Sequence, residues 1–272
     1  YRRYYVPNNA TLVIVGDVDA AEAIARARHH FGGAQPGLVP ARTISAEPAQ
    51  LGERRVVVQK PGTTAYLKVA YHAPAATDDH FFPMLLVDAV LTGAKGLNLW
   101  SSFTTPPPQR SARLYRALVE RRLASAVSGG LVPTADPYLY TISVTARDAA
   151  PREEVERATI AELDRVAREG MTAGELEKAR NQLRARLVFE NDSVTNIAHQ
   201  LGFFETIASA DFWPSVGDRL RAVTGDQAAD AAARVLRPTN RTVGWFEPLP
   251  IEDGGEAGGP APGLVAGRGD AR

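Results

Sequence analysis

The chain has 272 residues, of which 44% are hydrophobic and 23% charged, so it is long enough to bury a core in one large or two small domains. Its 31 basic and 31 acidic side chains balance, which argues against nucleic acid or an anionic membrane as the main partner. The sequence has no cysteine and no apolar run of membrane-spanning length, so disulfides, thiolate chemistry and a transmembrane helix are not expected.

The N-terminal part is expected to form a strand, a helix and a linker. Thr11–Val15 is apolar and β-branched, which predicts a strand. Asp19 with Glu22 three residues later is typical of a helix N-terminus and predicts a helix over Ala20–His30. Three prolines within residues 34–50 indicate a linker along the surface.

The middle of the chain combines strand patterns with one apolar helix. Strands are predicted at Arg54–Gln59 and Ala65–Tyr71, with a Pro-Gly turn between them. Phe81–Leu91 predicts a buried helix, and residues 94–110 predict an irregular insertion because they contain three consecutive prolines. The pattern then predicts a helix over Ser111–Arg122, followed by an antiparallel pair of strands at Ala124–Leu131 and Tyr138–Arg147.

The C-terminal half is predicted to be helical. Capping-box patterns at Thr172/Glu175 and Thr224/Gln227 mark two helix starts. The other expected elements are helices from Pro151, over Ile197–Ile207 and over Phe212–Val223, a final strand over Thr242–Phe246, and a disordered Gly/Pro-rich tail over 248–272. Strands in hairpin-like pairs followed by a block of helices predict an α+β fold, with an antiparallel sheet and helices packed on one face.

No pattern of catalytic or metal-binding residues is found. None of the five histidines has another His or a Glu at the spacing that places two ligands on one helical face; they are His29, His30, His72, His80 and His199. The sequence also has no nucleophile-elbow, dinucleotide or phosphate-loop motif. We therefore assign no catalytic and no metal residue; an unrelated α+β enzyme that uses His72 or His80 is the weakest alternative.

Four arginines lie on the predicted helix that leads into the helix–strand junction: Arg113, Arg116, Arg121 and Arg122. Such a group would grip a peptide carbonyl or a C-terminal carboxylate, or would simply be the solvated cationic end of a helix. The spacing favours the solvated helix end.

Three stretches of the sequence resemble the M16 family of zinc metallopeptidases, which includes insulinase and mitochondrial processing peptidase. They are YYVPNNATLVIVGD at 4–17, AYHAP at 70–74 together with SARLYRALVERRLASAVSGG at 111–130, and GMTAGELEKA at 170–179. The resemblance covers residues 1–247. It implies a LuxS- and processing-peptidase-like domain from the C-terminal part of a bacterial member, which forms one wall of a chamber that encloses unfolded peptides.

The chain departs from the family because it lacks the HxxEH motif of the zinc helix. The resemblance therefore implies that zinc and its glutamate base belong to an N-terminal M16 domain or a partner M16 chain, and that this chain alone is inactive and holds no cofactor. It also implies a periplasmic or cell-envelope location. Tyr1–Tyr5 reads like the interior of a domain, in keeping with a fragment or a processed product.

A second departure concerns substrate binding. Many members carry an arginine and a tyrosine at the helix–strand junction, and the matching positions here are Val119 and Ser125. The candidate substrate-binding residues are therefore Arg121 and Arg122, as substitutes for the arginine, together with Ser125. The missing pair also supports an alternative function: a non-catalytic scaffold or partner subunit for peptide binding or assembly.

Overall fold

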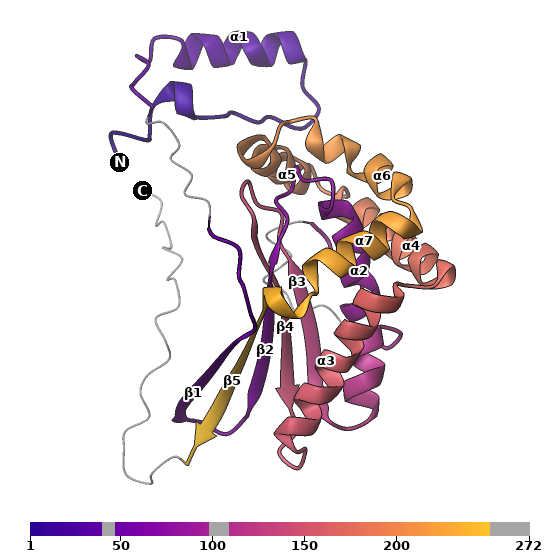
Figure 1. Ribbon diagram of the computed structural model, residues 1–272. Helices are drawn as coiled ribbons and strands as arrows, with labels where there is room; N and C mark the ends of the chain where they lie inside the picture. Colours follow the sequence, from indigo (N-terminus) through magenta and orange to yellow (C-terminus); the bar gives the residue numbers. More distant parts are fainter. Residues whose placement is uncertain (40–46, 98–108, 251–272) are drawn as a thin grey trace.

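The computed structural model describes residues 1–39, 47–97 and 109–250. In this part of the chain a five-stranded sheet is covered on one face by helices (Figure 1), which confirms the predicted α+β class. The strands are β1 (Arg54–Pro61), β2 (Tyr66–Ala73), β3 (Ala124–Leu131), β4 (Tyr138–Ala146) and β5 (Arg241–Leu249). The α-helices are α1 (Ala20–Phe31), α2 (Phe81–Thr92), α3 (Arg152–Glu169), α4 (Ala173–Glu190), α5 (Val194–Ile207), α6 (Phe212–Ala222) and α7 (Gly225–Val235). Three short helical segments complete the description: η1 (Pro7–Asn9), η3 (Tyr115–Glu120) and η4 (Pro238–Asn240).

The sheet is mixed rather than wholly antiparallel. Its strand order is β1-β5-β2-β4-β3; β1 runs parallel to β5, and the other neighbouring pairs are antiparallel. The predicted pairing of the first two strands is wrong, because β5 lies between them. A Pro-Gly turn signal specifies that the chain changes direction, but not which strand becomes the neighbour. Here β5 becomes the neighbour and buries Val243 and Trp245 in the core.

The predicted strand at Thr11–Val15 is also wrong. The segment pairs with no strand, and no residue among 1–39 is buried. The helix that follows is confirmed as α1, and its N-terminus is capped as expected: the Glu22 backbone N–H donates to Asp19 Oδ1 at 2.8 Å. Local hydrogen bonds therefore form this helix without any tertiary packing of its apolar side.

The predicted helix at Ser111–Arg122 is largely replaced by the six-residue π-helix η3. Wider i to i−5 turns of this kind are uncommon and frequently occur at functional sites. The strand pair that follows is confirmed: β3 and β4 are antiparallel, and β4 buries alternate residues such as Ile142 and Val144.

The predicted C-terminal helices and the final strand are confirmed. Both capping boxes are present, with Thr172 and Glu175 at the start of α4 and Thr224 and Gln227 at the start of α7. The boundaries of three predicted irregular regions cannot be compared in full. Residues 40–46 of the linker, 98–108 of the insertion and 251–272 of the tail lie outside the described residues, while β5 runs to Leu249.

The core lies between the sheet and helix α2, all twelve residues of which are buried. One polar group sits inside it. Asp88 of α2 accepts hydrogen bonds from Tyr140 at 3.0 Å, Thr92 at 2.7 Å and Lys95 at 2.9 Å. Burial, together with the neighbouring Asp88 carboxylate, raises the pKa of Tyr140, so its hydroxyl stays a donor. These contacts satisfy a carboxylate that would otherwise strongly destabilise the core.

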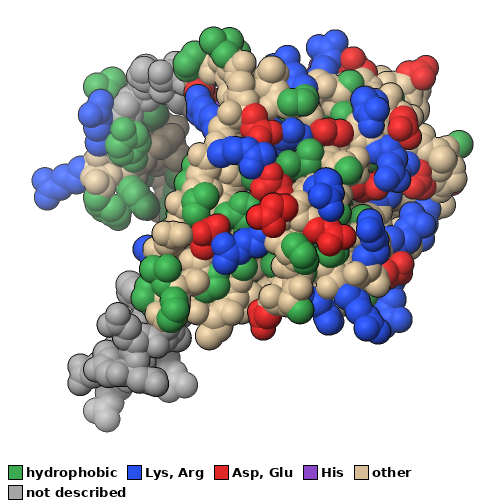
Figure 2. All heavy atoms as spheres, turned by 60° about the horizontal axis from the view of Figure 1, so that its bottom comes forward, with side chains coloured by type: hydrophobic (Ala, Val, Ile, Leu, Met, Phe, Trp, Pro, Cys, Tyr) green, Lys and Arg blue, Asp and Glu red, His purple; other side chains and the backbone are tan. Residues whose placement is uncertain are grey.

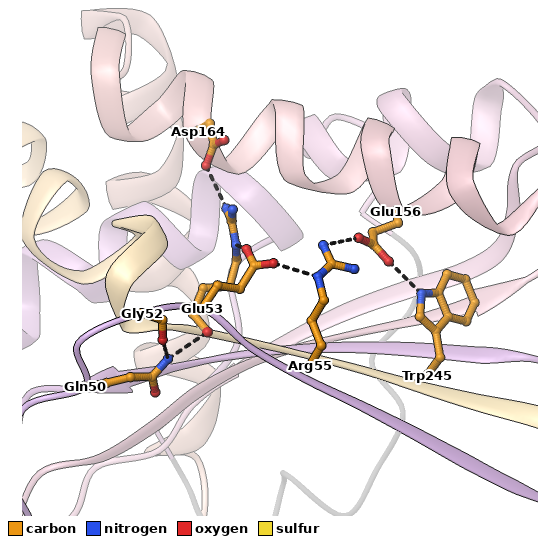
Figure 3. A network of polar contacts seen from close by, with 8 residues as sticks. Gln50, Gly52, Glu53, Arg55, Glu156, Asp164 and Trp245 are labelled. Carbon is orange, nitrogen blue, oxygen red and sulfur yellow. Dashed lines mark hydrogen bonds and ion pairs between the residues drawn. The ribbon is translucent and has the colours of Figure 1, made fainter.

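Polar contacts attach the parallel edge of the sheet to α3 (Figure 3). Arg241 of β5 is 6% exposed, and its guanidinium donates to Glu53 at 2.7 Å and to Asp164 of α3 at 2.9 Å. Arg55 of β1 forms an ion pair with Glu156 of α3 at 2.7 Å. All eight residues of β1 are exposed, so this strand is held by hydrogen bonds and ion pairs more than by apolar burial.

Candidate functional site

The junction between η3 and β3 is a helix C-cap of the Schellman type. The Arg122 backbone N–H donates to the Val119 carbonyl at 3.0 Å, and the Leu123 N–H donates to the Leu118 carbonyl at 2.9 Å. Leu118 and Leu123 are both buried, which supplies the apolar contact that accompanies this motif. The cap fixes the direction in which the chain enters the edge strand.

Arg122 occupies the left-handed position of this cap with φ 62°. It is the only non-glycine with positive φ among the described residues. A side chain there costs about 1–2 kcal/mol relative to the right-handed region, and glycine is the usual occupant. The strain is a property of this position and does not extend to Arg121, where φ is −82°.

Ser125 is the extra residue of a β-bulge at the start of β3. The register passes from Ala124 opposite Ala146 to Ala126 opposite Thr145, and Ser125 has no partner of its own. Its hydroxyl donates to the Thr145 carbonyl at 3.3 Å. Bulges at sheet edges re-aim side chains, and this one exposes Ser125 at the end of the strand.

Arg121 points in a different direction, toward the helical layer. Its guanidinium lies 4.0 Å from Glu154 of α3, and the side chain is 62% exposed. It borders a hollow of about 600 Å³ between η3, α3 and the start of α4. No hydrogen bond or ion pair joins Arg121, Arg122 and Ser125 in the part of the chain that the structure describes, so the three predicted residues are neighbours without forming one constellation.

The hollow is lined by charges of both signs: Arg113, Arg116, Arg121 and Arg165 with Glu162, Glu169 and Glu175. Arg113 is not free to bind substrate, because it forms a two-point ion pair with Glu175 at 2.8 and 2.6 Å. Its hydrogen bonds lower the pKa of Glu175 to about 2. The sequence identified Glu175 as a capping residue but gave no signal of this second partner, which lies 62 residues away.

Within the described residues, no helix covers the opposite face of the sheet (Figure 1). Over β3 and β4 this face carries small and polar side chains, whereas toward β1 and β5 it also carries Val56, Val58, Tyr66 and Phe246. On β4 the half-exposed residues are Thr141, Ser143 and Thr145, which alternate with buried Ile142 and Val144. Ser143 lies opposite Ser128 of β3 on one side and Lys68 of β2 on the other. Hydroxyl groups and small residues leave this face open to hydrogen bonding with a ligand laid across it.

The edge strand β3 borders this face. Its other side is unpaired within the described sheet, so it offers free backbone donors and acceptors to an extended peptide. Val119, the position that the sequence resemblance aligns with an arginine of many M16 members, is half-buried against the core. A valine cannot hydrogen-bond a substrate carbonyl, so the junction lacks that contact.

The two histidines proposed for a rival enzyme have structural partners. His72 Nδ1 lies 3.0 Å from Asn240 Oδ1, and the Asn240 amide donates to the His72 carbonyl at 2.9 Å. His80 bridges Asp78 at 2.8 Å and Asp230 at 3.2 Å, which links the start of α2 to α7. Across the described ranges, no group of three or more His, Asp or Glu side chains has the geometry to hold a metal ion, so the donors present do not fit a zinc site.

On the side seen in Figure 2, acidic and basic side chains are interspersed over the middle of the view, and several basic side chains gather at the lower right. No helix in the described ranges has both the length and the apolar character of a membrane span.

Comparison with known proteins identifies similar sequences and architectures. A family model described as "Peptidase M16 inactive domain" matches residues 1–183. The beta subunit of mitochondrial-processing peptidase from Lentinula edodes is 22% identical over 202 residues, which make up 73% of this chain and 42% of the relative. The chain therefore spans less than half the length of this curated relative.

Solved structures agree on the fold. A protease from Helicobacter pylori matches with a TM-score of 0.74 and 18% identity, and the match covers 90% of this chain and 57% of the protease chain. The first half of the periplasmic protease PqqL from Escherichia coli matches with a TM-score of 0.63 and 16% identity, over 90% and 52%. An inactive peptidase domain from Bordetella parapertussis matches with a TM-score of 0.58 and 24% identity, over 72% of this chain and 98% of its own.

Proposed function

This chain belongs to the M16 peptidase family as an inactive C-terminal domain, and from that premise we propose that it forms one wall of a peptide-binding chamber, paired with another M16 domain that holds the catalytic zinc. The observation that carries the proposal is the uncovered face of the sheet. Its hydroxyl-bearing and small side chains, exemplified by Thr141, Ser143 and Ser128, suit a surface that contacts unfolded peptides of varied sequence.

The peptide would be held mainly through backbone hydrogen bonds. An extended segment added along β3 would satisfy the strand's free N–H and C=O groups whatever the peptide sequence. Arg122, which is exposed just before this edge, would supply a cationic contact for peptide carbonyls or a carboxylate. Zinc-activated water and its glutamate base would come from the paired domain.

The proposal is tested by reconstitution with the M16 domain that the same reading frame or a companion gene encodes. We expect this chain alone to bind no zinc and to leave a quenched fluorescent peptide uncut, and the pair to bind zinc and cleave it. Arg122→Gln in the pair should lower kcat/KM several-fold, whereas Arg165→Gln, on α3, should not. Stoichiometric zinc and cleavage by this chain alone would contradict the proposal.

A non-catalytic scaffold is the second candidate function. It is favoured by the sequence resemblance, in which Val119 and Ser125 best match the arginine and tyrosine of many M16 members, and neither side chain can replace them. The motif of the paired domain decides between the two functions, because an intact HxxEH supports the peptidase and a degenerate one supports the scaffold.

A periplasmic location is proposed from the family and from the likeness to a periplasmic protease. Fractionation of the producing cells tests this location.

A further inference from the structure

The N-terminal segment, residues 1–39, differs from the rest of the molecule in burying nothing. Every other α-helix in the described ranges contains at least two buried side chains, whereas α1 contains none. Figure 1 shows this segment at one end, away from the sheet, and in Figure 2 it projects at the left with several hydrophobic side chains in view. A helix with regular caps and no buried face lacks the packing that normally stabilises it.

The exposed side chains form one apolar surface. In the extended segment Leu12 is 58% and Ile14 49% exposed; in α1 Ile24 is 51% and Phe31 62% exposed. Leu12, Ile14, Val18 and Phe31 line a common hollow of about 510 Å³, which Asp17, Glu22 and Arg26 border with charge. An apolar floor with a polar rim is the usual form of a surface that is covered in the functional assembly.

The extended segment has the composition and geometry of a strand without a sheet. Val13 lies against Gly202 of α5, so its neighbours Leu12 and Ile14 point the other way, toward the hollow. In a β–α unit the strand pairs with a sheet edge and the helix covers the next strands, whose side chains fill the space beneath it. The hollow occupies the position of those missing side chains.

The comparisons indicate which kind of sheet is missing. The match to the inactive domain from Bordetella parapertussis includes 98% of that domain but only 72% of this chain. The matches to the Helicobacter pylori protease and to the first half of PqqL include 90% of this chain, although they include little more than half of those structures. Part of this chain therefore has a counterpart in these two longer chains that the Bordetella parapertussis domain lacks.

We propose that residues 10–33 belong structurally to a second, different M16 domain: Thr11–Val15 pairs with an edge strand of its sheet, and α1 covers that sheet through the side that carries Ala23, Ala27 and Phe31. This inference rests on the proposed function for the identity of the partner. It deepens that function by naming the surface through which the two domains are joined.

The test uses this chain and the M16 domain of its reading frame or companion gene, made as separate polypeptides. We expect the backbone amides of residues 11–15 to exchange rapidly in this chain alone and to become protected when the second domain is added. Ile14→Asp should weaken association at least tenfold, because a charge would be buried without a partner. Val188→Asp is the matched control, since Val188 is 70% exposed on α4, in the helical layer, and it should leave association unchanged.

The outcomes separate this inference from the proposed function. Association that is unaffected by Ile14→Asp and leaves amides 11–15 unprotected would overturn the inference while the chamber proposal stood. Association through this surface without peptide binding would overturn the chamber proposal alone. Self-association of this chain that protects residues 11–15 would identify a second copy as the occupant and would also overturn the inference. Equal thermal midpoints of the variants show that they fold.

Discussion

Arg113 and Glu175 form a two-point ion pair, with Nε 2.8 Å from Oε1 and Nη2 2.6 Å from Oε2. The side chains are only 13% and 25% exposed. The same carboxylate accepts the Thr172 backbone N–H at 3.0 Å, so one glutamate both caps α4 and holds the segment that leads into η3. The ion pair therefore positions the helix–strand junction relative to the helical layer.

Removing the arginine should destabilise the protein. Arg113→Met keeps most of the aliphatic stem but leaves the Glu175 carboxylate without its charged donor, at a cost of about 2 kcal/mol. The free energy of unfolding in urea measures this. Arg165→Met is the control: Arg165 is 52% exposed and pairs with Glu162 at 3.2 Å, so its loss should cost no more than about 0.5 kcal/mol. Equal effects of the two variants would contradict the assignment.

The same ion pair should make stability depend on acid pH. Its hydrogen bonds to Arg113, ahead of the opposing effect of burial, lower the pKa of Glu175 from 4.5 to about 2. The unfolded chain therefore binds this proton at higher pH than the folded chain does, and the stabilisation is present above pH 4.5 and lost as the pH falls toward 2.

Glu175→Gln tests this dependence while keeping a side chain that can still complete the capping box. The stability difference between wild type and variant should be largest near neutral pH and should shrink below pH 4.5. Urea titrations across this range measure it. A difference that stays constant down to acid pH would show that the carboxylate charge contributes nothing.

Arg122→Gly should stabilise the protein, because it removes the side chain that strains the left-handed position. The relief of about 1–2 kcal/mol exceeds the added flexibility of glycine in the unfolded chain, leaving a net gain of about 0.5–1 kcal/mol. Arg122→Ala should not give this gain because it retains Cβ. Arg121→Gly, at φ −82°, should destabilise slightly. Thermal midpoints compare the three, and a loss of stability in Arg122→Gly would refute the strain.

Gly129→Ala should destabilise the junction between α2 and β3. An added Cβ would lie 2.5 Å from Asp88 Oδ1 and 2.7 Å from Thr92, and both side chains belong to the buried polar group of the core. We expect a loss of about 1–3 kcal/mol, as for other overpacked core positions. Gly130→Ala is the neighbouring control, with its nearest contact at 3.5 Å, and should change the unfolding free energy much less.

Much of the local structure could be predicted from the sequence. The capping boxes at Thr172 and Thr224 and the strand β4 were predicted and are confirmed. They could be predicted because a cap is a hydrogen bond between residues three apart, and because alternation records which face of a strand is buried. The candidate site was harder to predict. Its predicted members Arg121 and Ser125 point in different directions because Ser125 lies in a β-bulge, and no local sequence pattern reveals that bulge.

By itself the sequence determined the helix starts, the α+β class and the absence of a zinc-helix motif, because each depends on residues close together in the chain. Only the tertiary structure decided that β5 separates β1 from β2, that Arg113 pairs with Glu175, and that Thr11–Val15 has no strand beside it. Those outcomes depend on which distant surfaces compete successfully for burial and hydrogen bonding, a competition that short-range patterns do not record.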